Sequence, residues 1–379
     1  MTLIAHLSDT HLGYRQYNLT ERERDFYEAF NEAIDKIISE RVEIVIHSGD
    51  LFDSSRPSTE ALLTVLRAVK KLHEKGIKIY TIPGSHDQPK RKGLPPHALF
   101  EQLGVRVLRA SNPYDVYDNI IICGVQYVPG AFKPVILKKL SELARVAEKY
   151  SKRILVLHQA IYQFLPFDYE LTLEDLPKLF HYYALGHIHK RILQNFGEGV
   201  LAYSGSTEIW SRDEYKEYQR NGKGFYLVDL SRDIPHVHKV DLESIRPHME
   251  FEIDLDRISL KTHLAEILSK LARFTSPKKP IVHLNVRGTN INRQELQRYV
   301  SRHLSPRALA IRWNIEEKSL GVLEGDFERS SNISIKQLLK EALEDDTKAS
   351  FAYELFSLLA KGDVEEAKEL AKKFFEEGT

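Results

Sequence analysis

Cysteine is nearly absent from this chain of 379 residues, which contains one, Cys123. A single thiol excludes a framework of internal disulfides. The sequence also lacks an N-terminal signal segment and any apolar run long enough to span a bilayer. These absences favour a soluble protein of the cytoplasm.

Net charge is absent as well. Lys plus Arg and Asp plus Glu each number 54, so the formal net charge is zero. If the protein binds nucleic acid, it must do so through a local basic surface rather than through its overall charge. The length allows two or three domains, each with its own core.

What the sequence does contain is a set of Asp and His side chains at the ends of apolar runs. Asp9 and His11 are two residues apart near the N-terminus, and His187 and His189 are two residues apart much later. In an extended segment such residues point to the same side, so each pair presents two potential metal ligands together. Three segments between the pairs also carry potential ligands directly after an apolar run: Asp50, residues 85–87 and His158.

Strand and helix patterns alternate over the first 245 residues. TLIAHLS, EIVIHSG and IKIYTIPG predict buried strands, and residues 20–42 and 57–76 between them predict amphipathic helices. Thr20 and Glu23 have the spacing of a capping box. Further strands are predicted by NIIICGV, RILVLH, YYALG, GVLAYSG and GFYLVDL. The pattern indicates an α/β fold, a sandwich of two stacked and largely parallel sheets flanked by helices.

The candidate ligands share one position in this pattern, since they follow predicted strands. In open α/β folds, ligands collect beyond the carboxyl ends of the strands. The sequence therefore predicts one shared metal site at that edge, formed by residues including Asp9, Asp50, Ser85, His158 and His187.

The composition changes near residue 246. Residues 1–245 form the first predicted domain, and residues 246–320, with three strands and two helices, form a small α+β domain. A polar linker over residues 321–333 leads to short helical stretches over residues 334–379. The apolar residues at helical spacing in this tail include Leu338, Leu339, Phe351, Leu355 and Leu358. From periodicity alone, they cover either this chain's own second domain or a partner.

The predicted site suits a pair of divalent cations. Two such ions about 3.5–4 Å apart can clamp a phosphate, generate hydroxide and stabilise both oxygens of an in-line displacement. Asp50 is the natural bridging ligand, because a carboxylate has two oxygens and most other candidates are imidazoles. A mixed nitrogen and oxygen shell suits Mn²⁺, Fe²⁺, Zn²⁺ or Co²⁺ better than Mg²⁺ or Ca²⁺, and we expect two Mn²⁺ ions.

These motifs resemble a known family. SDTH, SGDLFD, GSHD, LHQ and YYALGHIH, in that order, resemble the five motifs of the calcineurin-like metallophosphoesterases. The longer stretches HLSDTHLGYRQ, HSGDLFDSSRPS, YYALGHIHKR, YSGS and GKGFYLVD are similar to the archaeal and eukaryotic double-strand-break repair nucleases of the meiotic-recombination-eleven family and their bacterial relative SbcD. The resemblance runs through the first predicted domain and into RPHMEF. It implies a nuclease domain followed by a domain that caps the DNA.

The resemblance also implies roles for individual residues. It assigns Asp9, His11, Asp50 and His189 to a first metal ion, and Asp50, Ser85, His158 and His187 to a second. His86 would act on the phosphate as proton donor or electrostatic stabiliser, and the neighbouring Asp87 is a candidate for orienting its imidazole. Ser85 replaces the amide of the family's GNHD motif, which predicts a weaker second metal site, and Asp53 stands where many relatives carry a histidine.

The function implied by the resemblance is that of a Mn²⁺-dependent DNA nuclease in double-strand-break repair. It would act as a 3'-5' exonuclease on duplex DNA and an endonuclease on single strands. It would form a homodimer through the apolar helix Ser58–Lys75 and bind an SMC-like coiled-coil ATPase through residues 334–379. The same core also suits a phosphatase or a cyclic-nucleotide phosphodiesterase, and a DNA-end-binding scaffold is the third possibility.

Basic residues follow the metal motifs in the sequence. They predict salt-sensitive contacts with the DNA backbone, through Arg15, Arg56, Lys90, Arg91, Lys92, Lys190 and Arg191.

Overall fold

The computed structural model describes residues 2–89 and 93–317, and in the C-terminal segment residues 339, 343, 345–361, 370–372 and 374. The chain divides into two compact units. The first consists of Met1–Glu252, Lys261–Asn285 and Gln297–Asn314, and the second of Ile253–Leu260, Val286–Leu296 and Ile315–Thr379.

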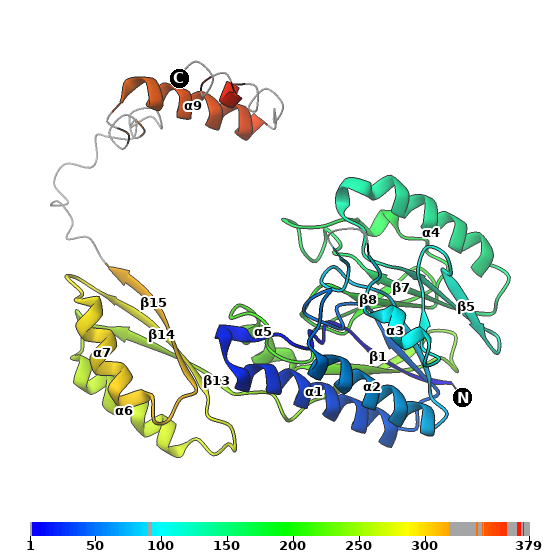
Figure 1. The fold of residues 1–379 in the computed structure, drawn as a ribbon, viewed down its shortest axis with the longest axis horizontal. Helices are drawn as coiled ribbons and strands as arrows, with labels where there is room; N and C mark the ends of the chain where they lie inside the picture. The colour runs from blue at the N-terminus through cyan, green and yellow to red at the C-terminus, as the bar shows by residue number, and fades with distance from the viewer. Residues whose placement is uncertain are drawn as a thin grey trace. The chain divides into compact units, whose positions relative to one another are not determined.

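Two six-stranded sheets form the framework of the first unit (Figure 1). The first sheet has the order β12-β11-β1-β2-β3-β4. Its strands are β1 (Leu3–Leu7), β2 (Ile44–His47), β3 (Lys78–Thr81), β4 (Arg106–Val107), β11 (Gly224–Asp229) and β12 (His236–Asp241). The strands β1 to β4 are parallel, and the register pairs Leu7 with His47 and His47 with Thr81. The carboxyl ends of three parallel strands therefore meet at one edge.

The second sheet has the order β5-β6-β7-β8-β10-β9. Its strands are β5 (Tyr114–Tyr117), β6 (Ile120–Val125), β7 (Lys152–His158), β8 (Tyr182–Gly186), β9 (Ile192–Phe196) and β10 (Gly199–Tyr203). The central strands β6, β7, β8 and β10 are parallel, and His158 at the end of β7 pairs with Gly186 at the end of β8. In this sheet, too, the carboxyl ends of several parallel strands lie at one edge.

Three apolar layers hold the sheets and helices together. The helices α1 (Thr20–Ser39) and α2 (Thr59–Glu74) cover the outer face of the first sheet, and α4 (Lys133–Ala147) covers that of the second (Figure 1). Between the sheets lies a layer of fully buried side chains that includes Ile46 and Val156. Burial of each such aliphatic side chain contributes about 1.5–3 kcal/mol. The predicted α/β sandwich of two sheets flanked by helices is confirmed.

Local details differ from the predictions. The capping box of Thr20 and Glu23 is wrong, because Leu19 is the N-cap of α1 and no side chain caps the helix there. Glu23 instead accepts hydrogen bonds from Arg15 and from the Tyr27 hydroxyl. The short helices α3 (His97–Glu101) and α5 (Glu214–Asn221), and the long α4, were not predicted.

A three-stranded sheet follows in the order β13-β14-β15. Along the chain the elements are β13 (His248–Asp254), α6 (Leu260–Arg273), β14 (Ile281–Gly288), α7 (Arg293–Leu304) and β15 (Ala310–Glu317). This is the order that the sequence pattern predicts over residues 246–320. The boundaries of the predicted domains stay a prediction.

The described part of the C-terminal segment contains one long helix, α9 (Asp346–Lys361). Phe351 on this helix stacks on Phe374, with ring centroids 3.9 Å apart. The predicted linker and Leu338 lie outside the described residues. In the part of the chain that the structure describes, no helix is long and apolar enough to cross a membrane.

Candidate metal centre

The carboxyl ends of strands from both sheets bring the candidate ligands together. Asp9 and His11 follow β1, Asp50 follows β2, His158 ends β7, and His187 follows β8. Four of these residues have a positive backbone φ, namely Asp9 (52°), His11 (41°), Asp50 (52°) and His187 (86°). Such conformations are strained in residues other than glycine, and strain of this kind clusters at functional sites.

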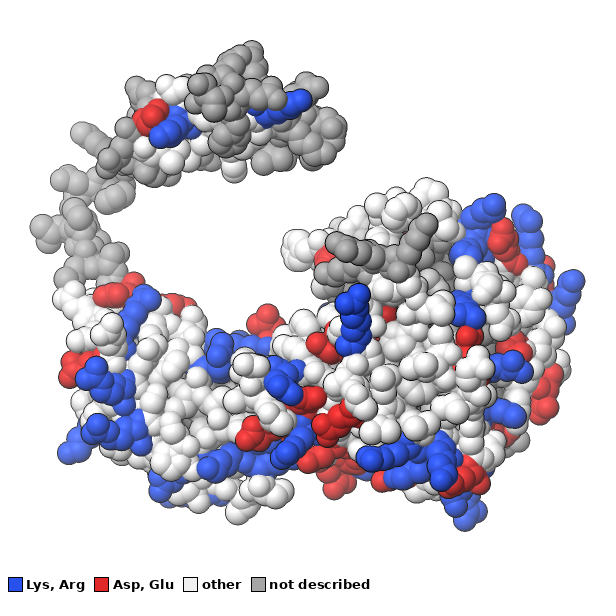
Figure 2. Space-filling model, viewed as in Figure 1, with Lys and Arg blue, Asp and Glu red and all other residues white. Residues whose placement is uncertain are grey.

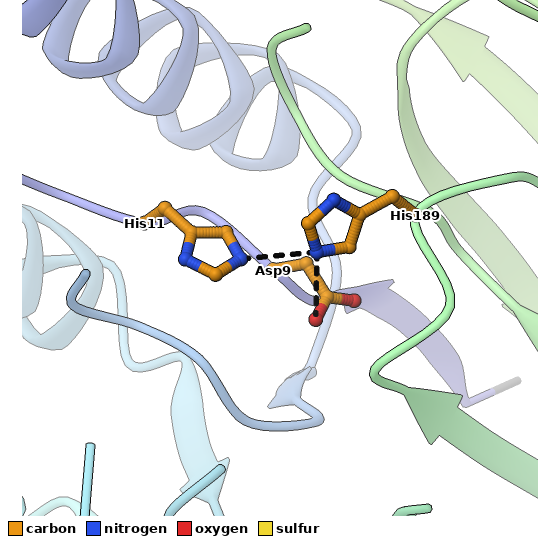
Figure 3. A group of neighbouring side chains, drawn as sticks. All are labelled: Asp9, His11 and His189. Carbon is orange, nitrogen blue, oxygen red and sulfur yellow. Dashed lines mark hydrogen bonds and ion pairs between the residues drawn. The ribbon is translucent and has the colours of Figure 1, made fainter. Parts of the chain in front are cut away.

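One group consists of Asp9, His11 and His189, whose ligand atoms all lie within 4.8 Å of one another. The Nε2 atoms of His11 and His189 face each other at 3.1 Å, and His189 Nε2 lies 3.9 Å from Asp9 Oδ1 (Figure 3). Residues almost 180 positions apart thus point two imidazole nitrogens and a carboxylate toward one position. This arrangement could hold a metal ion.

A second group consists of Asp50, His158 and His187, again with ligand atoms within 4.8 Å of one another. His158 Nε2 is buried and lies 3.3 Å from Asp50 Oδ2 without hydrogen-bond geometry. His11 Nε2 lies 3.8 Å from the same oxygen. Asp50 therefore stands between the two groups, where a bridging ligand would have to be.

Two of the histidines are fixed from behind by acceptors. His158 Nδ1 donates to the carbonyl oxygen of Ser48 at 2.7 Å, and His189 Nδ1 donates to Glu214 Oε1 at 2.9 Å. In the neutral imidazole, a hydrogen bond donated by Nδ1 sets the tautomer and leaves Nε2 with a free lone pair. When both rings are neutral, their Nε2 atoms have the form that a metal ligand needs.

The electrostatics of the site follow from burial and mutual charge. Burial favours the neutral carboxyl of Asp50, but His158, His11 and His86 outweigh it and hold the pKa well below its usual value. Burial also opposes the charge on His158, yet Asp50 raises the pKa of that imidazole to about 9. Burial and the neighbouring His158 lower the pKa of His187 to about 4. In the metal-free state His158 therefore carries a proton at neutral pH, and His187 is neutral.

The GSHD segment lies directly against Asp50. The Ser85 hydroxyl donates to Asp50 Oδ2 at 3.3 Å, and the backbone N–H of His86 donates to Oδ1 at 2.8 Å. The half-exposed His86 imidazole donates through Nδ1 to the carbonyl oxygen of Asp53 at 3.0 Å. The remaining nitrogen, Nε2, is left to accept or donate a proton at the site.

Asp87 does not orient His86, contrary to the prediction. Its fully buried carboxylate accepts the backbone N–H groups of Leu51, Phe52 and Gly84 at 3.2, 2.9 and 2.9 Å. It ties the loop after β2 to the loop after β3. Asp87 thereby fixes the backbone around Asp50 and not the neighbouring imidazole.

The sequence reasoning missed several polar residues that support the histidines. Glu214, which accepts from His189, also accepts from the buried Lys223. Lys223 donates in addition to the carbonyl oxygen of His189 at 3.0 Å. Glu170 lies 4.0 Å from His187 Nε2. No spacing marks these residues, because they stand far along the chain from the histidines that they contact.

The predicted DNA contacts differ in their surroundings. Arg56 is exposed and lines a cavity of about 840 Å³ together with Ser85 and His86. Lys190 is exposed, whereas the exposed Arg15 pairs with Glu23 at 2.6 Å. The prediction that Arg191 contacts DNA is wrong. Its guanidinium is buried, pairs with Asp241 and donates to backbone carbonyl oxygens. Lys90, Arg91 and Lys92 lie outside the described residues.

The charged residues on one face are mixed in sign. Figure 2 shows Lys and Arg beside Asp and Glu along the edges of the first unit, with uncharged surface between them. Any attraction for a polyanion on this face must come from a few local cations, in line with the zero net charge.

Comparison with known proteins defines the class. Residues 2–191 match the calcineurin-like phosphoesterase family, whose two-metal chemistry fits the paired ligand groups. The protein is therefore a metal-dependent phosphoesterase with a divalent two-metal centre.

The particular family follows from the curated relatives. The chain is 45% identical over 285 residues to the DNA double-strand break repair protein Mre11 of Methanocaldococcus jannaschii, covering 74% of this chain and 75% of that protein. It is 40% identical to Mre11 of Saccharolobus solfataricus, covering 78% of each chain. It is 38% identical to Mre11 of Methanococcus maripaludis, covering 95% of each chain. The chain belongs to the Mre11 family of DNA double-strand break repair proteins, and the predicted resemblance is confirmed.

Metal loading should release a proton. At pH 7.5 the metal-free protein carries a proton on His158, whose pKa is about 9, and a ligating imidazole must be neutral, so binding should displace about one proton. Calorimetric titration with Mn²⁺ in two buffers of different ionisation enthalpy measures this release. The release should vanish above about pH 10, well past the pKa of His158. An enthalpy that does not depend on the buffer at pH 7.5 would contradict the expectation.

Proposed function

We propose that this protein is a Mn²⁺-dependent nuclease that hydrolyses DNA phosphodiesters during double-strand-break repair. It acts as a 3'-5' exonuclease on duplex ends and as an endonuclease on single strands. The observation that carries the proposal is the meeting of two His- and Asp-containing ligand groups at Asp50, beside the half-exposed His86. Membership of the Mre11 family supports DNA as the substrate. The site of action is the compartment that holds the DNA, the cytoplasm.

The proposed ligands divide between two ions. Asp9, His11, Asp50 and His189 hold the first, and Asp50, Ser85, His158 and His187 hold the second. The donor set fits, because Nε2 of the buried His158 has no hydrogen-bond partner among the described residues and the Nε2 atoms of His11 and His189 face each other beside Asp9. When bound there, two divalent ions would supply a hydroxide and neutralise charge on the phosphate. Mn²⁺ suits this mixture of imidazoles and carboxylates.

The side chains around the metals prepare the phosphate for attack. Asp50 keeps its negative charge because its pKa is low, and the Ser85 hydroxyl and the His86 N–H fix its orientation. His86 projects into the open cavity that Arg56 also lines. From this position His86 Nε2 can donate a proton to the leaving oxygen. Arg56 and Lys190 supply backbone contacts to the DNA, and residues 246–320 cap it.

Two surfaces serve assembly in this proposal. On α2, Leu63 and Leu66 are each 40% exposed although the same helix buries Val65 and Val69. Exposed leucines on a helix of the first unit fit a homodimer contact. On α9, Tyr353 and Phe356 are exposed beside the predicted stripe of Phe351, Leu355 and Leu358. This tail is the proposed docking site for an SMC-like coiled-coil ATPase, in a helix-in-groove mode.

The first test is Mn²⁺-dependent degradation of linear duplex DNA by the wild type and His86→Ala. Loss of the proton donor should lower the rate by about 10²–10⁴-fold while Mn²⁺ binding is kept. The control is His236→Ala, an exposed histidine of β12, which should retain the wild-type rate. Efficient cleavage of an aryl phosphate without cleavage of DNA would favour a phosphatase. A wild type that binds DNA ends but never cleaves them would favour a scaffold.

The second metal site is tested by Ser85→Asn. The serine hydroxyl is one bond shorter than an amide and donates to Asp50, so the second ion should bind more weakly than the first. In Ser85→Asn the amide oxygen should increase the affinity for the second ion by roughly tenfold, about 1.4 kcal/mol. Calorimetric titration with Mn²⁺ resolves the two steps. Equal affinities in the wild type, or no gain in Ser85→Asn, would refute the expectation.

Sedimentation tests the two proposed assembly surfaces, α2 for the homodimer and α9 for the ATPase, independently of each other. Leu63→Asp with Leu66→Asp should convert a micromolar dimer into a monomer, because a charge cannot be buried unpaired. Phe351→Asp with Leu355→Asp should keep the dimer and abolish co-sedimentation with the ATPase. A wild type that sediments as a monomer would remove the dimer from the proposal, and undiminished co-sedimentation would remove the tail contact.

A further inference from the structure

Trp210, in the loop between β10 and α5, packs against three of the site's histidines. Its ring centroid lies 5.6 Å from that of His11, 6.0 Å from that of His86 and 5.4 Å from that of His189. The indole also stacks on Tyr14, with ring centroids 5.2 Å apart and planes 23° apart. One indole thus contacts imidazoles from three separate loops.

Asp53 connects this indole to two of the same histidines. Trp210 Nε1 donates to Asp53 Oδ1 at 3.2 Å. That oxygen lies 3.4 Å from His11 Nδ1 and 3.8 Å from His86 Nδ1. The carbonyl oxygen of Asp53 accepts from His86 Nδ1 at 3.0 Å. The carboxylate therefore lies behind both rings, on the side away from their Nε2 atoms.

Both members of the pair are held by the surrounding chain. The backbone carbonyl oxygen of Trp210 accepts from the Gln16 side chain at 2.8 Å. The backbone N–H of Trp210 donates to the Glu214 carboxylate at 3.3 Å. The fully buried Arg22 donates to the carbonyl oxygen of Ile209 at 2.8 Å. The N–H of Asp53 donates to the carbonyl oxygen of Leu12 at 3.2 Å. These hydrogen bonds fix the backbone from which the Trp210 and Asp53 side chains project.

His11 differs from His158 and His189, whose Nδ1 atoms each have a hydrogen-bond acceptor. His158 has the Ser48 carbonyl behind it, and His189 has Glu214. Among the described residues, His11 Nδ1 is buried without a hydrogen-bond partner, and the Asp53 carboxylate is 3.4 Å away. Metal-bound histidines commonly give their other ring N–H to a carboxylate or a carbonyl, and this contact orients the ring. Asp53 occupies that position for His11.

We propose that Asp53 and Trp210 form a bracket that positions His11 and His86. Asp53 accepts from His11 Nδ1 and so turns Nε2 toward the first metal, and its backbone carbonyl holds His86 at the cavity. Trp210 keeps the Asp53 carboxylate in place and limits rotation of the imidazoles. Both are positioning residues, since neither is placed on the substrate. The inference rests on the proposed function, and it gives a role to the Asp53 that departs from the family pattern.

The test measures Mn²⁺ affinity apart from cleavage. Free Mn²⁺ is followed by electron paramagnetic resonance for the full chain, wild type and Asp53→Ala. Loss of such an outer contact should weaken the tighter site by about 10–100-fold. Asp53→Asn, which keeps an acceptor for both donors, should restore most of that affinity. In DNA cleavage, Asp53→Ala should lower kcat through a misplaced His86 and leave KM little changed.

A double-mutant cycle then asks whether Trp210 acts through Asp53. Trp210→Phe keeps an aromatic ring but removes the indole N–H, and it should weaken Mn²⁺ binding in the wild-type background. In the Asp53→Ala background the same substitution should have little effect, because the acceptor is already gone. Controls are Trp313→Phe, at the chain's other tryptophan on β15, and Asp35→Ala, whose carboxylate pairs with Lys71 at the surface. Thermal unfolding of every variant reports its folding.

The outcomes separate this inference from the proposed function. Wild-type Mn²⁺ affinity in a folded Asp53→Ala overturns the bracket, and so do strictly additive effects in the cycle. If Asp53→Ala fails to fold, Trp210→Phe decides, and unchanged Mn²⁺ affinity and kcat in that folded variant overturn the bracket. Weakened Mn²⁺ binding in a protein that cleaves no DNA keeps the bracket and refutes the nuclease. A wild type that binds no Mn²⁺ refutes both.

Discussion

The buried carboxylate of Asp50 is the constraint on which the site depends. Its side chain is almost fully buried, so its charge is tolerable only because hydrogen-bond donors and the protonated His158 surround it. Ser85 and His86 lie in the loop after β3 and His158 ends β7, and each of the three approaches this one group. The two ligand groups meet at Asp50 because the strands that carry them end at the same edge of the sandwich. In the proposed metal-bound state, divalent cations held by these residues would replace the proton on His158 as the source of positive charge.

At this edge the backbone segments approach so closely that two positions, 84 and 186, have no room for a side chain. A Cβ added to Gly186 would overlap the carbonyl oxygen of Ser48, and one added to Gly84 would overlap the backbone nitrogen of Asp50. At the same edge, Asp9, His11 and Asp50 have positive φ. Conformations of this kind cost about 1–3 kcal/mol each. The three apolar layers offset the cost, which is why the ligands sit on a rigid sandwich.

Much of the fold and site was predictable from local patterns. The strands ending before Asp9, Asp50 and His187 were found from their apolar runs, because burial on both faces leaves a continuous apolar signature. The helix α4 was missed although Ile136, Leu140, Leu143 and Ala147 are all buried at helical spacing. The capping box at Thr20 failed because Glu23 has stronger partners in Arg15 and Tyr27. Propensity gives way where tertiary contacts are stronger.

The sequence by itself determined the identity and order of the candidate ligands, since Asp and His at successive strand ends predict the chemistry of a divalent two-metal site. Only the tertiary structure decided which nitrogens face one another and which acceptors lie behind them. It also turned Asp87 toward backbone N–H groups and buried Arg191 against Asp241. These contacts join residues far apart in the chain. They depend on strand order and loop paths across two sheets, which no local pattern of residues encodes.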